Sequence, residues 1–257
     1  MATSSRTEFG DFLRSRREKL SPDEAGLRSG RRRRTPGLRR EEVAELAGIG
    51  VDWYVRLEQG RTVSPSDATL DALAVALRLG NVEAAHLRAL ARNGDRGTFV
   101  AERVPPAVER VVAGLNLPAY VTGRRWDILT WNDAAADVLG FDRLAVPDRN
   151  ILAFMFIEAD SRRLFGRTWT DEARRMVALF RATYDLHAGD PAFVELVERV
   201  RTRSPEFAKW WNTHDIRSGT AGQKVLVHRE RGAQRYEYAT FQANDDPALK
   251  LSIYMPI

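Results

Sequence analysis

The amino-acid sequence predicts two domains, a mainly α N-terminal domain and an α+β C-terminal domain with a five-stranded antiparallel sheet. Stretches with helical periodicity fill the first 92 residues, and a turn-rich segment, RNGDRGT, then interrupts the pattern. Strand-like alternation follows on both sides of a large helical insertion at residues 133–213. We therefore expect a domain at 1–92, a linker at 93–105 and a second domain at 106–257.

The N-terminal segments are predicted to be short helices. Residues 7–20 place Phe9, Phe12 and Leu13 among charged residues, as in an amphipathic helix. A polar segment rich in Gly and Arg follows, and then a pair of short helices within VAELAGIGVDWYVRLEQG, residues 43–60. Ser64 is the expected cap of the next helix, and residues 81–92 are expected to form one more.

The C-terminal segments alternate between helix and strand patterns. A short helix is expected at 106–115, and PAYVTGRRWDILTWN is typical of a β-hairpin around a turn that contains glycine. The helical insertion is interrupted near the proline of residues 145–150. Three strands follow, in QKVLVHRE, AQRYEYATFQ and LKLSIYMP. An antiparallel sheet accommodates this order of elements.

Composition and charge favour a folded protein that meets a polyanion. Apolar residues make up 44% and charged residues 29%, a balance typical of globular domains. There is no cysteine and no apolar run of the roughly 20 residues that a membrane helix needs. The first residues lack the apolar core of a signal peptide, so we expect no export. We expect a bacterial, cytoplasmic protein. Residues 1–40 hold 12 basic and 5 acidic side chains, so positive charge lies at the front of the chain.

The spacing within residues 43–60 is typical of a helix-turn-helix. The first helix needs a small residue where the two helices cross, and Ala44 provides it. Gly48 suits the turn, while Tyr54 and Leu57 fall at buried positions of the second helix. This arrangement leaves five side chains on or near the exposed side, namely Val51, Asp52, Trp53, Val55 and Arg56.

LRREEVAELAGIGVDWYVRLEQGR, followed by PSDATLDALAVALRL, resembles the XRE-type helix-turn-helix of MmyB-like transcription regulators. The resemblance implies a lambda-repressor-like domain whose second helix enters the DNA major groove. It implies DNA contacts by Arg39, Arg40, Val51, Asp52, Trp53, Arg56, Arg61 and Thr62. Gly50 departs from the usual Ser or Thr cap, and Asp52 places a negative charge towards phosphates. The alternative for Trp53 and Val55 is packing inside the domain.

The run of four arginines before the motif is a candidate phosphate-binding arm. It supplies positive charge that residues 41–95 lack, since these hold 5 basic and 9 acidic side chains. The alternative is a solvated loop. The arginines of this run are Arg31, Arg32, Arg33 and Arg34.

The second half of the chain also resembles MmyB-like regulators, in PAYVTGRRWDILTWNDAAADVLG, SPEFAKWWNTHDIRSGTAGQKVLVH and YEYATF. This resemblance implies a PAS-like fold around an apolar pocket for a small lipophilic, fatty-acid-like ligand. The candidate ligand-binding residues are Phe154, Phe156, Trp169, Arg174, Phe180, Trp210, His214, Tyr236 and Tyr238. Each aromatic residue has ordinary core packing as its alternative, and His214 has a structural role as its alternative.

No signature of catalysis accompanies these motifs. The sequence lacks G-x-S-x-G, a P-loop and H-E-x-x-H, and its four histidines have no metal-ligand spacing. We therefore expect no enzymatic activity, no cofactor and no metal. The expected function is that of a ligand-responsive homodimer that binds palindromic operator DNA to regulate transcription and is associated with the nucleoid when bound. The alternative is a small-molecule-binding or enzymatic PAS-like domain with a vestigial helix-turn-helix.

Overall fold

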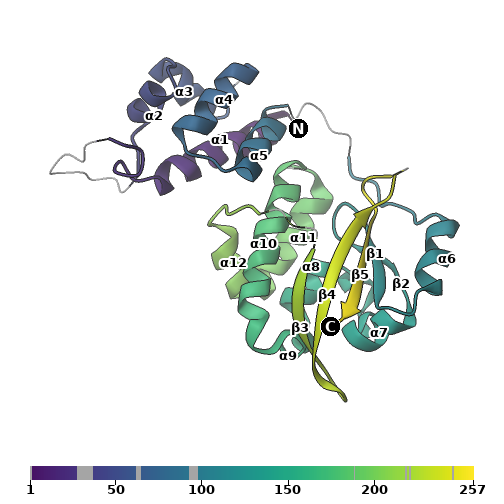
Figure 1. The fold of residues 1–257 in the computed structure, drawn as a ribbon. Coiled ribbons are helices and arrows are strands. Elements are labelled where there is room, and N and C mark those ends of the chain that lie inside the picture. Colours follow the sequence, from purple (N-terminus) through teal and green to yellow (C-terminus); the bar gives the residue numbers. More distant parts are fainter. Residues whose placement is uncertain are drawn as a thin grey trace. The chain divides into compact units, whose positions relative to one another are not determined.

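A computed structural model describes most of the chain, namely residues 2–27, 37–61, 65–92, 98–187, 189–217, 219, 221–244 and 246–257. The chain divides into two compact units (Figure 1). The first comprises residues 1–98, 184–194 and 213–217, and the second comprises 99–183, 195–212 and 218–257. Within the described ranges, no helix is both long enough and apolar enough to cross a membrane.

The first unit begins with five helices. They are α1 (Ala2–Lys19), α2 (Arg40–Leu46), α3 (Val51–Glu58), α4 (Asp67–Ala76) and α5 (Asn81–Ala91). The helix α1 packs against α3 and α5, while α2 packs against α3 and α4. Apolar side chains at helical spacing fill the space between the helices, among them Phe12, Leu13, Leu70, Leu73 and Leu87. The prediction of a helical N-terminal domain with a helix-turn-helix is confirmed.

Side chains make hydrogen bonds at the N-terminal ends of two helices of this unit, α4 and α2. The Ser66 hydroxyl accepts a hydrogen bond from the Thr69 backbone N–H at 3.2 Å and thereby caps α4. The expected cap Ser64 lies outside the described residues, and the cap is the serine two positions later. The Glu42 carboxylate accepts from the Arg39 backbone N–H at 2.7 Å at the start of α2.

The second unit is built on one five-stranded antiparallel sheet. Its strands are β1 (Ala119–Thr122), β2 (Ile128–Trp131), β3 (Ala221–His228), β4 (Gly232–Gln242) and β5 (Lys250–Pro256). Their order in the sheet is β2-β1-β5-β4-β3, and each neighbouring pair is antiparallel. The predicted hairpin and the three predicted C-terminal strands are all present, so the predicted α+β, PAS-like fold is confirmed.

Helices surround this sheet (Figure 1). The helix α6 (Pro106–Gly114) precedes β1. The chain between β2 and β3 forms the predicted helical insertion, with helices α7 (Asp133–Leu139), α8 (Ile151–Ile157), α9 (Ala159–Phe165), α10 (Trp169–Asp185), α11 (Pro191–Arg203) and α12 (Pro205–Trp211). Pro147 lies in a 3-10 turn, Val146–Asp148, within the predicted break.

The two faces of the sheet bury different kinds of side chain. On one face, Val121 of β1 packs with Val112 of α6 and with Leu249. Successive strand residues point to opposite faces, so Tyr120 of β1 and Tyr254 of β5 belong to the other face. There α9 packs against β3. The second face therefore carries the polar and aromatic groups.

Candidate nucleic-acid and ligand sites

The helices α2 and α3 meet through the residues that the spacing predicts. Val43, Ala44 and Tyr54 are fully buried, and Leu57 is nearly so. Gly48 takes φ +63°, which a side chain rarely adopts, and it allows the chain to turn between the helices. The turn and these buried side chains fix which face of α3 is turned outwards.

The outer face of α3 carries the side chains proposed to read DNA. Val51 is 39% exposed, Asp52 and Arg56 are exposed, and Trp53 is half-buried. Arg39 and Arg61 are exposed as well. The predicted contacts Thr62 and Arg31–Arg34 lie outside the described residues.

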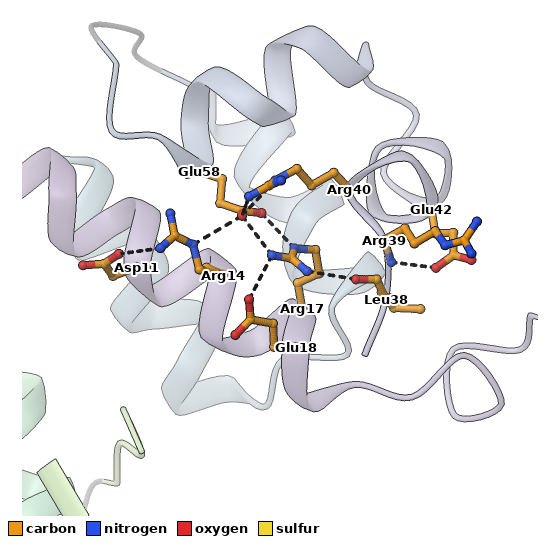
Figure 2. Close-up of polar contacts among 9 residues, drawn as sticks. All are labelled: Asp11, Arg14, Arg17, Glu18, Leu38, Arg39, Arg40, Glu42 and Glu58. Carbon is orange, nitrogen blue, oxygen red and sulfur yellow. Dashed lines mark hydrogen bonds and ion pairs between the residues drawn. The ribbon is translucent and has the colours of Figure 1, made fainter. Parts of the chain in front are cut away.

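Glu58, at the C-terminal end of α3, is the centre of a cluster of arginines (Figure 2). Its side chain is fully buried. Arg17 of α1 donates from Nε to Oε2 at 2.8 Å and from Nη2 to Oε1 at 2.9 Å. Arg40 of α2 donates from Nε and Nη2 to Oε1 at 3.0 and 2.8 Å. Arg14 Nε lies 3.5 Å from the same oxygen. One carboxylate therefore links α1, α2 and α3, and we call this set the Glu58 cluster.

Electrostatics favour the ionised form of Glu58. Burial raises the pKa of the carboxyl, but the hydrogen bonds and charges of Arg17 and Arg40 outweigh burial and leave that pKa below its usual value. Burial and the negative charge of Glu58 raise the pKa of the neighbouring Tyr54. The hydroxyl of Tyr54 therefore stays protonated near neutral pH.

Arg40, which the sequence predicts to contact DNA, is already engaged in an ion pair within the domain. Its guanidinium is fixed on Glu58, while its side chain remains 42% exposed. A phosphate that reached Arg40 would meet a donor of defined position. Sequence reasoning missed Glu58 as a partner, although it lies four residues after Tyr54 and so shares its inner helix face.

The predicted ligand residues fall into separate groups. Phe156, Trp169 and Trp210 form one aromatic group, with ring centroids 5.9 to 6.2 Å apart. The exposed Arg174 stacks over the Trp210 ring at 5.6 Å. Phe180 contacts Trp211 outside this group, with ring centroids 6.3 Å apart.

The second group lies on the sheet. Tyr236 and Tyr238 of β4 both contact the Tyr254 ring, with centroids 6.2 and 5.7 Å from it. Tyr120 lies 6.1 Å from Tyr254, and Phe154 connects to Tyr120 through Phe141. The remaining candidate, His214, belongs to the first unit and has φ +51°. The structure therefore does not gather all nine predicted residues around one point.

Sequence reasoning also missed Lys224 of β3. This lysine is buried, and its Nζ lies 3.3 Å from Glu172 Oε2 of α10. The sequence carries no signal for this, because Val225 and Val227 on the opposite face are apolar, and only the structure shows that Lys224, Leu226 and His228 are the buried side chains of the strand. Lysine is rarely buried without a partner, and Glu172 is the partner here.

Comparison with known proteins agrees with this geometry. The family model described as the MmyB-like transcription regulator ligand binding domain matches residues 104–257. A helix-turn-helix domain model matches residues 8–87. A search of curated proteins returned no match.

Proposed function

The chain belongs to the MmyB-like transcription regulators, DNA-binding proteins with a ligand-binding domain, and on this premise we propose that it binds operator DNA as a homodimer and senses a small lipophilic molecule. The exposed N-terminal face of α3 carries the DNA part of the proposal. Val51, Asp52 and Arg56 are exposed where a recognition helix meets base edges. The proposed operator is a palindrome with half-sites about one helical turn apart.

The DNA proposal is tested by gel shift with the upstream region of the gene itself. We expect binding at low salt, and we expect Arg56→Ala to weaken binding and to change the ranking of operator variants, because side chains facing base edges carry sequence preference. Arg92→Ala removes another exposed arginine, on the end of α5, and should leave that ranking unchanged. Absence of a shift at low salt would contradict the proposal.

The proposed lipophilic ligand is supported by the number of aromatic side chains buried in the second unit. Phe154, Phe156 and Trp169 are each at most 6% exposed. Apolar and aromatic walls with a few polar groups are typical of small-molecule sites. Native mass spectrometry of protein purified from bacteria tests this part. A co-purified apolar molecule that is released on denaturation is expected, whereas protein of bare mass in repeated preparations would contradict it.

A further inference from the structure

The face of the sheet opposite the aromatic face is buried unevenly. The helix α6 packs against β1 and β2 (Figure 1). Ala119 and Val121 of β1, which point to the side of α6, are buried almost completely. Ile253 and Leu251 of β5 lie directly opposite them in the ladder, yet these two side chains are only half-buried. Burial on this face therefore decreases from β1 to β5.

Apolar side chains continue across the three less covered strands, and we call this surface the β3-β4-β5 face. An antiparallel sheet that turns one face to water usually carries polar side chains there. Alternation along each strand and the register of the ladders instead give this face Val225, Val227, Ala239, Phe241, Leu251, Ile253, Met255 and Ile257. Phe241 and Ile257 are 56% and 58% exposed. A contiguous apolar surface of this kind is typical of an interaction site.

Two opposite charges interrupt this apolar surface on its middle strand. Arg235 and Glu237 are successive residues of β4 on the β3-β4-β5 face, about 7 Å apart along the strand. Both are exposed, and neither has an ion-pair partner among the described residues of its own chain. Because the two charges cancel, they give a polyanion such as DNA no net attraction to this place. They suit a partner that presents the same two charges in the opposite order.

A second copy of the chain presents the charges in that order. In a two-fold symmetric dimer, the same surface is used by both copies. If the axis crosses β4 at Tyr236 and the two β4 strands run antiparallel, Arg235 of each copy faces Glu237 of the other. Parallel strands would instead bring like charges together. Ile257 lies beside Arg235 in the ladder and Met255 lies beside Glu237, so apolar side chains also face each other in the antiparallel arrangement.

We propose that two copies of this chain associate through the β3-β4-β5 face, with Arg235 of each copy paired with Glu237 of the other. The apolar side chains of the two faces provide the burial that stabilises the dimer. The charge pairs determine the orientation of the copies, because like charges would meet in the other orientation. The inference rests on the homodimer of the proposed function and adds to it the surface that forms the dimer and the direction of the strands.

Charge reversal tests the interface, with sedimentation velocity of the full chain at several concentrations as the measurement. The unmodified chain is expected to dimerise. Arg235→Glu and Glu237→Arg each place like charges opposite each other at two symmetric points, so each should weaken dimerisation about ten-fold or more. Both positions are exposed, so folding should be unaffected. Lys209→Glu reverses an exposed charge on α12 and should leave the dimer unchanged.

An equimolar mixture of the two reversed variants gives the sharper test. The Arg235→Glu chain presents two acidic side chains at these positions, and the Glu237→Arg chain presents two basic ones. Every contact between the two variants is therefore an opposite-charge pair, so the mixture should form heterodimers although each variant alone is mainly monomeric at the same concentration. Native mass spectrometry distinguishes the heterodimer from both homodimers by mass. Recovery in the mixture also shows that neither variant is misfolded.

The outcomes separate this interface from the proposed function. Dimers of the unmodified chain that neither charge reversal weakens overturn the β3-β4-β5 interface and leave the proposed homodimer standing. Reversed variants that stay monomeric when mixed also overturn the interface, because the two charges then do not face each other across the copies. An unmodified chain that stays monomeric at every concentration contradicts the proposed homodimer and overturns the interface with it.

Discussion

Glu58 and Lys224 are single residues whose burial gives each an effect well beyond its own position. Glu58 is an ionised carboxylate without exposure to water, and hydrogen bonds from Arg17 and Arg40 compensate for its missing hydration. These two arginines come from different helices, so removing the carboxylate affects the packing of α1, α2 and α3 at once.

Glu58→Gln tests the energetic part of this description. The variant keeps the shape of the side chain but removes the buried counter-charge of Arg17, whose side chain is only 8% exposed. We expect the free energy of unfolding to fall by about 3 kcal/mol, as for other broken buried ion pairs. Urea denaturation followed by circular dichroism measures the change. Glu18→Gln is the matched control: Glu18 also pairs with Arg17, but its side chain is 57% exposed, so a change below about 0.5 kcal/mol is expected.

The pH dependence of the same pair has a definite sign. The pKa of Glu58 is lowered in the folded chain, so its stabilising contribution is present above the unfolded-state pKa of about 4.3 and is lost as pH falls through the lower folded-state pKa. The stability difference between the unmodified chain and Glu58→Gln should therefore be constant from pH 7 to about pH 5 and then shrink in acid. A difference that stays constant down to about pH 2.5 would contradict this.

At the scale of secondary-structure elements, one asparagine joins the beginnings of a strand and a helix. The Asn132 Oδ1 accepts from the backbone N–H groups of Ala119 in β1 and Ala135 in α7, at 3.1 and 2.9 Å. Its Nδ2 donates to the carbonyl oxygens of Leu115 and Leu117, both at 2.8 Å. The side chain is therefore both a helix cap and a link between α6, β1 and α7.

Asn132→Ala should accordingly cost more than an ordinary helix cap. Loss of the cap alone is worth about 1 kcal/mol, and the buried backbone groups left without partners add to it, so a decrease of about 2–4 kcal/mol in the free energy of unfolding is expected. Asn212→Ala changes an exposed asparagine at the end of α12 in the same unit and should cost less than about 0.5 kcal/mol. Equal effects of the two variants on the urea midpoint would show that the four hydrogen bonds of Asn132 contribute little.

At the scale of the whole molecule, the proposed DNA contacts and the five-stranded sheet of the ligand-binding domain belong to different units. A ligand bound to one unit changes DNA affinity only if it binds one state of the regulator better than another. Coupling of this kind amounts to about 5–150-fold in typical allosteric proteins. By linkage, operator DNA must then change the affinity for the ligand by the same factor, which gives the proposed regulation an internal check.

The salt dependence of DNA binding is a further prediction at this scale. Residues 41–95, which contain helices α3 to α5 and all of α2 except Arg40, hold more acidic than basic side chains. The basic residues that precede α2 are therefore the proposed source of phosphate contacts. Changing Arg31–Arg34 to alanine should weaken binding to all sequences alike. It should also flatten the slope of log affinity against log salt by about 0.9 for each phosphate that is no longer neutralised. A filter-binding series at several salt concentrations measures the slope. An altered sequence preference with an unchanged slope would refute the proposed arm.

Local patterns were sufficient to predict the two folds. The helix-turn-helix follows from Ala44, Gly48, Tyr54 and Leu57, because a small residue, a flexible turn and buried side chains at fixed offsets are requirements within one short segment. The five strands follow from period-two alternation and turn residues, which are equally local. The exposed positions of α3 follow from the same helical periodicity.

The sites required the tertiary structure. Arg17 and Arg40 lie 41 and 18 residues from Glu58, and nothing in the local pattern states that they meet one carboxylate. The same holds for Lys224, which meets a carboxylate of α10 and aromatic rings of α9, β4 and β5, and for the aromatic residues that divide into separate groups. The periodicity of apolar residues in the sequence indicates whether a side chain is buried. The partners of that side chain depend on how distant segments pack against one another. Because these partners determine the chemistry of a buried charge, the site could be described only from the tertiary structure.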